Sequence, residues 1–280
     1  IFYMDCPEYL YQMEKSEQSK QLVKQRLMNY VSSTTKFIGE NGYSDVVRSS
    51  DVFNELLNRY PMDGEVPYQY RGAINQEPSL YRDFDNVKSG WLKHLDIEDL
   101  CDVIAEARRN LPSVDFMFND DNLTDPRKID ANIELISQIR KYEEEHGTKL
   151  IDSIGTQMHI DNNLSKADIE NMVRGLAQFG LPIEITEFDI AMTRNVEGLS
   201  DIQIETLRQQ KINEVYSVIE QLKDECNIRG FTIWSKTDKQ NFRVSLANEE
   251  RIKNGLEPIT TLHGGAFTED MKPKSKVYEK

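Results

Sequence analysis

The chain has 280 residues, of which 38% are hydrophobic and 29% are charged, and its formal net charge is −14. This length suits one large barrel or two ordinary domains. The negative charge argues against a nucleic-acid partner, because nucleic-acid-binding proteins need a basic surface. No apolar run approaches the roughly 20 residues that a membrane span requires. We therefore expect neither nucleic acid nor a membrane as partner, and the acidic composition fits a neutral polymer substrate.

Short strand-like runs alternate with long amphipathic helices, which is typical of parallel βα architecture. Buried parallel strands are expected to read as continuous apolar runs, and Phe116–Phe118 and Phe231–Trp234 do so. Six strands are predicted in chain order: Ile1–Met4, Val47–Asn54, Asp115–Asn119, Ile151–His159, Ile183–Glu187 and Gly230–Trp234.

Helices are predicted between these strands from apolar residues on one face and from sequence signals at the helix ends. The signals are capping residues, a proline at a first helical position and a glycine after a last one. The predicted helices are Ser19–Ile38, Asp96–Asn110, a helix that begins at Pro126 after the N-cap Asp125 and ends before Gly147, and two helices that open at the capping boxes Ser165/Asp168 and Ser200/Gln203.

Two long insertions, Leu56–Lys88 and Thr237–Thr268, follow predicted strands, where loops shape the active site of a barrel. No linker or internal repeat interrupts the chain, so residues 1–280 are predicted to form a single domain. A closed barrel of this kind has eight strands. Because the chain opens in the apolar run Ile1–Met4 without an initiator Met, we expect two further βα units upstream.

The three cysteines are widely spaced and form no C-x-x-C motif, so we expect no metal site, disulfide framework or cofactor. Cys101 lies on a helical pattern and is predicted to be a small core residue. The three are Cys6, Cys101 and Cys226.

Two predicted strands end in a glutamate, Glu55 and Glu187. Cleavage of a glycosidic bond uses two carboxyl groups that face each other across a sugar, one as proton donor and one as nucleophile or base. The carboxyl ends of parallel barrel strands could supply such a pair. The alternative is that each glutamate is an ordinary strand-end residue near solvent.

Further polar residues lie near these strand ends. Gln157 and His159 alternate along one strand and share a face, as do Glu187 and Asp189 on the next. A strand histidine is more often a satisfied core residue. Here an imidazole between two carboxylates would be held in orientation and would keep a nucleophile ionised.

Three other residues are candidate sugar contacts. Asn54 precedes Glu55, and its amide could hold a substrate hydroxyl. Asn119 lies in an Asn- and Asp-rich segment that could equally be a simple turn. Trp234 ends the last predicted strand, where its ring could form a floor for a pyranose or could fill the core.

Together these segments resemble glycoside hydrolase family 10, the retaining endo-β-1,4-xylanases. The resemblance follows the chain in order from the acid/base strand, through an Asn-Asp segment, a Gln-x-His strand and the nucleophile strand, to the eighth strand and the start of the closing helix. The corresponding segments are Val47–Glu55, Phe118–Asn122, Ile154–His159, Ile183–Ile190, Gly230–Asp238 and Lys272–Lys274.

The resemblance implies a (β/α)8 barrel, an α/β fold that is incomplete in this chain, and double displacement through a covalent xylosyl intermediate. It implies Glu55 as acid/base and Glu187 as nucleophile, with the two carboxyls about 5–5.5 Å apart. His159 is expected to bond the nucleophile and Asp189 to support that histidine. The substrate contacts that it implies are Asn54, Gln157 and Trp234, beside Asn119 as an expected sugar contact.

The chain departs from the family pattern at several positions. Tyr3 stands where the family carries a histidine that contacts the glycone sugar, and Tyr9 replaces a tryptophan. Ser50 replaces a tryptophan in the acid/base strand, and Phe242 replaces one after the last strand. We expect Tyr3 to remain a substrate contact, with an altered sugar preference.

Two other functions remain open at this stage. Another retaining glycosidase of the same barrel type could act on cellulose, mannan or a galactan, although the Gln157-x-His159 strand and Trp234 favour xylan. A barrel that binds carbohydrate without turnover is the second alternative, against which the intact glutamate pair argues. We expect a secreted monomer whose partner is xylan or a xylo-oligosaccharide.

Overall fold

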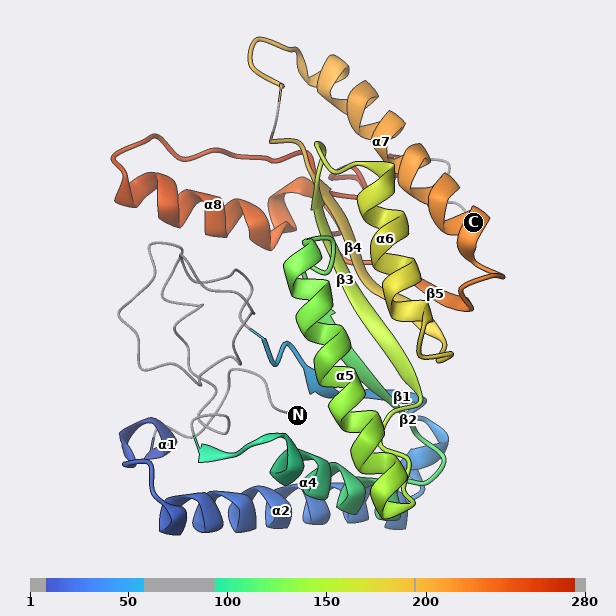
Figure 1. Ribbon diagram of the computed structural model, residues 1–280. Coiled ribbons are helices and arrows are strands. Elements are labelled where there is room, and N and C mark those ends of the chain that lie inside the picture. Colours follow the sequence, from blue (N-terminus) through green and yellow to red (C-terminus); the bar gives the residue numbers. More distant parts are fainter. Residues whose placement is uncertain (1–8, 58–93, 194, 275–280) are drawn as a thin grey trace. The chain divides into compact units, whose positions relative to one another are not determined.

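The computed structural model describes residues 9–57, 94–193 and 195–274, in which helices alternate with parallel strands (Figure 1). The strands are β1 (Ser49–Asn54), β2 (Asp115–Asp121), β3 (Ser153–Asp161), β4 (Ile183–Ala191) and β5 (Ile228–Ile233). The helices are α1 (Tyr9–Gln12), α2 (Glu17–Glu40), α4 (Ile97–Asn110), α5 (Pro126–His146), α6 (Lys166–Ala177), α7 (Asp201–Leu222) and α8 (Phe242–Lys253), with 3-10 turns η1 (Tyr43–Asp45) and η2 (Asp238–Gln240).

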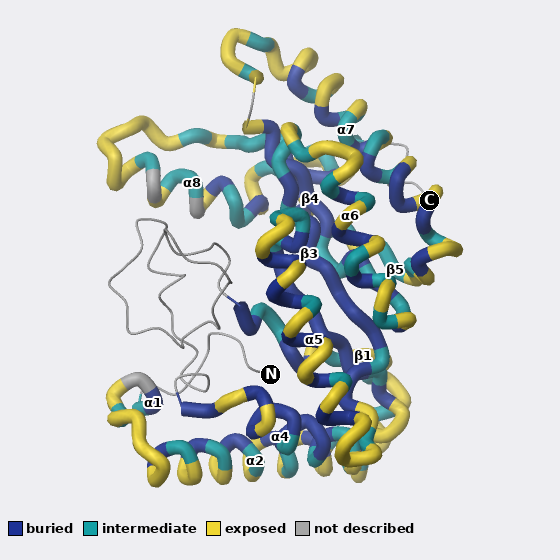
Figure 2. Tube along the Cα trace, viewed as in Figure 1, coloured by how far each residue is buried: buried dark blue, intermediate teal, exposed yellow. Residues whose placement is uncertain are grey.

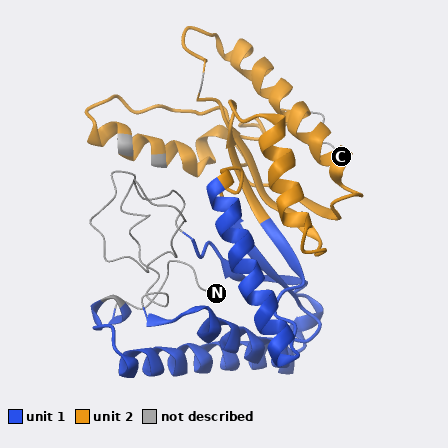
Figure 3. Cartoon of the chain, in the orientation of Figure 1, with its two compact units in different colours: residues 1–120, 127–155 blue, residues 121–126, 156–280 orange. Residues whose placement is uncertain are grey.

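The chain divides into two compact units (Figure 3). The first consists of residues 1–120 and 127–155, and the second of residues 121–126 and 156–280. In the first unit β1 pairs in parallel with β2. In the second unit β3, β4 and β5 follow one another in that order, and β4 pairs in parallel with β5.

Helix α2 packs against α4 in the first unit. Its buried residues recur every four positions and so form one face: Ser19, Val23, Leu27, Val31 and Thr35. Lysines on α2 reach carboxylates at the start of α4, with 2.6 Å between Lys20 Nζ and Oδ2 of the N-cap Asp96, and 2.9 Å between Lys24 Nζ and Asp99 Oδ1. Apolar packing and these ion pairs therefore act between the same two helices.

The first unit also contains an ion pair in its core. Lys128 of α5 lies 2.9 Å from Asp120 of β2, and both side chains have no exposed surface. Removing water from two charges is costly, and their attraction offsets this cost only while both partners are present.

Strands β3 and β4 form the buried centre of the second unit, and Figure 2 shows both largely in the dark blue of buried residues. Helix α6 packs against α7 and also contacts β4. The predicted capping box of α6 is present, since Ser165 Oγ accepts from the Asp168 N–H at 3.2 Å and Asp168 accepts from the Ser165 N–H at 3.0 Å. Gln203 likewise accepts from the Ser200 N–H at 2.9 Å before α7.

The predicted alternation of strands and helices is confirmed over the described residues. Three strand ends were predicted too early, since β2 continues to the buried Asp121. Likewise, β3 continues to Asp161 and β4 to Ala191. The reason is that Ile160, Ile190 and Ala191 are buried, so the apolar strand pattern continues past the polar site residues. His159 and Glu187 thus lie within strands and not at their ends.

Other predictions have mixed outcomes. Cys101 is fully buried, as expected of a core residue. The insertion Thr237–Thr268 contains the unpredicted helix α8. Pro273 lies in an isolated antiparallel bridge with Phe267, and the residues after Lys274, where the closing helix was expected to continue, lie outside the described residues. The strand Ile1–Met4, Cys6, Tyr3 and nearly all of the insertion Leu56–Lys88 lie outside the described residues. No helix in the described part of the chain combines the length and apolarity needed to cross a bilayer.

Candidate active site

Strands β3 and β4 bring a histidine between two carboxylates. His159 Nε2 lies 2.9 Å from Glu187 Oε2, and Nδ1 lies 3.2 Å from Asp189 Oδ1. Glu187 and Asp189 are two residues apart on β4 and so point to the same face of the sheet. The imidazole side chain is only 4% exposed, and that of Asp189 only 1%. The structure therefore brings together the three residues that the sequence suggested as one group.

The charge on this histidine is set by opposing effects. Burial disfavours an imidazolium, but the carboxylates of Asp189 and Glu187 outweigh burial and raise the pKa of His159 from near 6.5 to about 8. Burial likewise disfavours the Asp189 carboxylate, but His159 and Arg243 hold the pKa of Asp189 below its usual value. Near neutral pH the group therefore contains a charged histidine beside an ionised Asp189.

Two residues that sequence reasoning missed also hold Asp189. Ser235 donates its hydroxyl to Asp189 Oδ2 at 2.8 Å, and Arg243 Nη1 donates to Asp189 Oδ1 at 3.3 Å. Arg243 also donates to the Ile160 carbonyl and to Asp161 Oδ1, both at 2.7 Å. Neither residue belongs to a periodic pattern, and the only available signal was that Ser235 directly follows the last predicted strand, Gly230–Trp234.

Two aromatic rings lie edge-on to the histidine. The ring centroid of Trp234 is 6.3 Å from that of His159, and the centroid of Phe242 is 5.0 Å away. Trp234 directly follows β5 and is 51% exposed. The alternative that Trp234 fills the core is therefore wrong. A large exposed ring beside a buried ionic group can present an apolar face to the ring carbons of a sugar.

Glu55 follows the last residue of β1 in the first unit. Its backbone φ is +48°, in the left-handed region, and its N–H donates to the Asn119 carbonyl at 2.9 Å. A non-glycine residue in this region costs of order 1–3 kcal/mol, and such conformations cluster at functional sites. The strained backbone at Glu55 motivates a functional role for this glutamate.

Asn119 has a supporting position beside Glu55. It is almost fully buried in β2, and its side-chain amide donates to Asn54 Oδ1 at 3.2 Å and to Asp51 Oδ2 at 3.3 Å. These bonds fix the orientation of Asn54 just before Glu55. The suggested sugar contact of Asn119 stays a prediction.

Gln157 and Tyr3 complete the predicted set. Gln157 is buried in β3, two residues before His159 and on the same face of the strand. Its sugar contact stays a prediction. Tyr3 lies outside the described residues.

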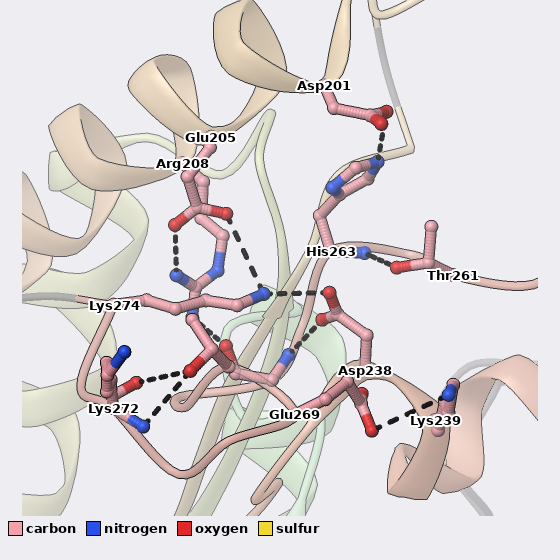
Figure 4. Close-up of polar contacts among 12 residues, drawn as sticks. Asp201, Glu205, Arg208, Asp238, Lys239, Thr261, His263, Glu269, Lys272 and Lys274 are labelled. Carbon is pink, nitrogen blue, oxygen red and sulfur yellow. Dashed lines mark hydrogen bonds and ion pairs between the residues drawn. The ribbon is translucent and has the colours of Figure 1, made fainter.

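A surface pocket of about 740 Å³ also lies in the second unit, away from these residues. Figure 4 shows polar contacts around it, where Lys274 lies 2.7 Å from Asp238 and 3.8 Å from Glu205. The guanidinium of Arg208, which is fully buried, donates to the Gly265 carbonyl at 2.7 Å. These bonds tie the segment after β5 to α7, and none of the predicted site residues lines the pocket.

The sequence of this chain matches a known protein family and is similar to that of known xylanases. The sequence model of Glycosyl hydrolase family 10 matches residues 1–254. Endo-1,4-beta-xylanase A of Thermotoga maritima is 23% identical over 252 residues, which cover 89% of this chain and 21% of that protein. The protein of the same name from Thermoanaerobacterium saccharolyticum is 25% identical over 205 residues, covering 71% of this chain and 15% of that protein. The chain thus spans about a fifth of the length of the curated relatives, or less.

Solved structures show the same architecture. A GH10 endoxylanase retrieved from a sugarcane soil metagenome superposes with a TM-score of 0.68 at 18% identity, covering 96% of this chain and 70% of that chain. Xylanase B from Clostridium stercorarium F9 gives 0.65 at 22% identity, covering 96% and 68%. The chain therefore has the (β/α)8-barrel fold of these structures, over about 70% of their length.

Proposed function

Since the chain belongs to glycosyl hydrolase family 10, we propose that it is a retaining endo-1,4-β-xylanase that cleaves internal bonds of xylan. The observation that carries this proposal is the pairing of Glu187 with His159 at 2.9 Å inside a matched family domain. The names of the relatives support xylan as the substrate.

In the proposed mechanism, Glu187 attacks the anomeric carbon while Glu55 donates a proton to the leaving glycosidic oxygen. The resulting bond between Glu187 and the sugar is hydrolysed by a water that Glu55 deprotonates, so that the product keeps its anomeric configuration. Glu55 therefore acts as the acid and then as the base, whereas Glu187 acts as the nucleophile.

Charge around Glu187 supports its assignment as the nucleophile. Below pH about 8, His159 is protonated and donates through Nε2 to Glu187, so a positive charge lies directly beside the oxygen atoms proposed to attack. Asp189 holds the charged ring from its other side. The proposed substrate contacts are the exposed ring of Trp234 and the side chains of Asn54, Gln157, Asn119 and Tyr3.

We extend the proposal to the setting of this activity. Residues 1–280 are proposed to belong to a single catalytic domain, because the family match runs across both compact units. The proposed partner is xylan or a xylo-oligosaccharide, met by a monomer outside the cell, because a polymeric substrate has to be cut before it can be taken up.

The test is a hydrolysis screen over xylan, carboxymethylcellulose and mannan, together with aryl β-xylobiosides. We expect cleavage of xylan, its loss on every substrate in Glu187→Ala, and a first step on activated aryl substrates that survives in Glu55→Ala, because a good leaving group needs little protonation. Glu184→Gln is the matched control, since Glu184 is also on β4 but bonds Arg229 Nε at 2.7 Å. Preferential cleavage of another polymer would contradict xylan specificity. Binding of xylan with equal inactivity of wild type and Glu187→Ala would indicate a non-catalytic barrel.

A further inference from the structure

Arg243 reaches the proposed active site from α8, a helix that the sequence did not predict. Its side chain is 17% exposed, and its guanidinium bonds the ends of two strands. It donates to the Ile160 carbonyl and to Asp161 on β3, and to Asp189 on β4. Because Ile160 directly follows His159, these bonds fix the backbone beside the histidine as well as the carboxylate that faces it.

We propose that Arg243 is a positioning residue of the active site, which holds Asp189 so that His159 is directed toward Glu187. This inference rests on the proposed function and adds a positioning residue to it.

The hydrogen-bond pattern around Asp189 supports this role. Arg243 Nη1 and His159 Nδ1 both approach the same oxygen, Oδ1, at 3.3 and 3.2 Å, while Ser235 occupies Oδ2 at 2.8 Å. The contact of Nδ1 with Oδ1 lacks hydrogen-bond geometry, whereas Nε2 bonds Glu187 at 2.9 Å. With Arg243 sharing Oδ1, the ring makes its better bond to the proposed nucleophile.

The charges around Asp189 also support a positioning role for Arg243. Two carboxylates on one strand face a single imidazole, and the guanidinium compensates one of them. Removing this positive charge raises the affinity of every neighbouring group for protons. The charged and titratable groups of the cluster are His159 and Asp161 on β3, Glu187 and Asp189 on β4, and Arg243 on α8.

The kinetic test compares Arg243→Gln and Arg243→Lys with wild type on an aryl β-xylobioside. We expect kcat to fall about 10- to 100-fold in Arg243→Gln, with KM nearly unchanged. This magnitude is taken by analogy from metalloenzymes, where it follows removal of the residue that orients a ligating histidine. In Arg243→Lys, kcat should fall less than in Arg243→Gln, because the ammonium can still bond one of the two carboxylates, Asp189 or Asp161. It should stay below the wild-type value, because one ammonium cannot bond both. Arg251→Gln is the matched control, since Arg251 lies on the same helix and bonds the Glu257 carbonyl at 2.6 Å. Wild-type kcat in Arg243→Gln would overturn the proposal.

Two further measurements separate positioning from a loss of structure. The acid limb of the kcat/KM profile should move up by about one pH unit in Arg243→Gln, because Asp189, which faces His159, loses a nearby positive charge. The NMR titration of His159 should likewise move to higher pH. A purely structural role would separate the ring from its carboxylates and lower its pKa toward 6.5, and that result would overturn the proposal. The titration needs no turnover, so a wild-type chain inactive on xylan would end the proposed function while Arg243 could still be judged.

Discussion

The charge on His159 gives the most quantitative prediction. Its pKa of about 8 lies about 1.5 units above the ordinary value of 6.5, and each unit corresponds to about 1.4 kcal/mol. The folded protein therefore binds this proton about 2 kcal/mol more tightly than the unfolded chain does. Since the side chain is only 4% exposed, solvent screening reduces this figure little.

The pH dependence follows from linkage. Below pH 6.5 the histidine is protonated in both the folded and unfolded states, and the full stabilisation of about 2 kcal/mol is present. Between pH 6.5 and 8 only the folded state keeps the proton, so the free energy of unfolding falls as pH rises. Above pH 8 the contribution is lost.

The assay has two parts. An NMR titration of the four histidines, with His159 assigned by the signal missing in His159→Asn, should give a pKa near 8. Urea unfolding of wild type and His159→Asn between pH 5.5 and 9 should show their difference in unfolding free energy shrinking by about 2 kcal/mol toward high pH. Asp189→Asn should lower the pKa of His159 more than Glu187→Gln does, because Asp189 makes the larger contribution. A histidine that titrates at or below pH 6.5 would refute this reasoning.

Two other predictions concern the core and the exposed ring. Lys128→Met should lower the free energy of unfolding by about 3–5 kcal/mol, because it removes the ammonium that lies 2.9 Å from the buried Asp120 carboxylate. In contrast, Lys141→Met, at an exposed pair on the same helix, should change it by less than about 0.5 kcal/mol. Equal urea midpoints for the two variants would contradict this. Trp234→Ala should raise KM for xylo-oligosaccharides about 5- to 30-fold, from about 1–2 kcal/mol of lost apolar contact, with a smaller change in kcat. An unchanged KM would remove Trp234 from the proposed substrate surface.

Local sequence patterns were sufficient to predict much of the fold. Capping pairs such as Ser165 with Asp168 act over three residues, so they can be read directly and are present as predicted. The period-two spacing of Glu187 and Asp189 correctly predicted a shared face, and the neighbouring strand correctly supplied His159. The strand ends were less predictable, because burial of Ile190 and Ala191 depends on what packs over them.

Long-range contacts explain what the sequence could not provide. Arg243 bonds Asp161 across 82 residues of sequence and Asp189 across 54, and no periodicity connects such positions. The left-handed backbone of Glu55 depends on its bond to the Asn119 carbonyl in another strand. The sugar contact of Asn119 was predicted from its residue type and stays a prediction, while its hydrogen bond to Asn54 became visible only in the structure.

The central claim is that Glu187 is the group that attacks the sugar. Its most direct test is incubation with a 2-deoxy-2-fluoro-β-xylobioside carrying a good leaving group, since the fluorine slows hydrolysis of the covalent intermediate, followed by peptide mapping by mass spectrometry. We predict a single fluoroxylobiosyl group on Glu187. A label on a different residue, or no label in a protein that turns over aryl xylobiosides, would contradict the assignment.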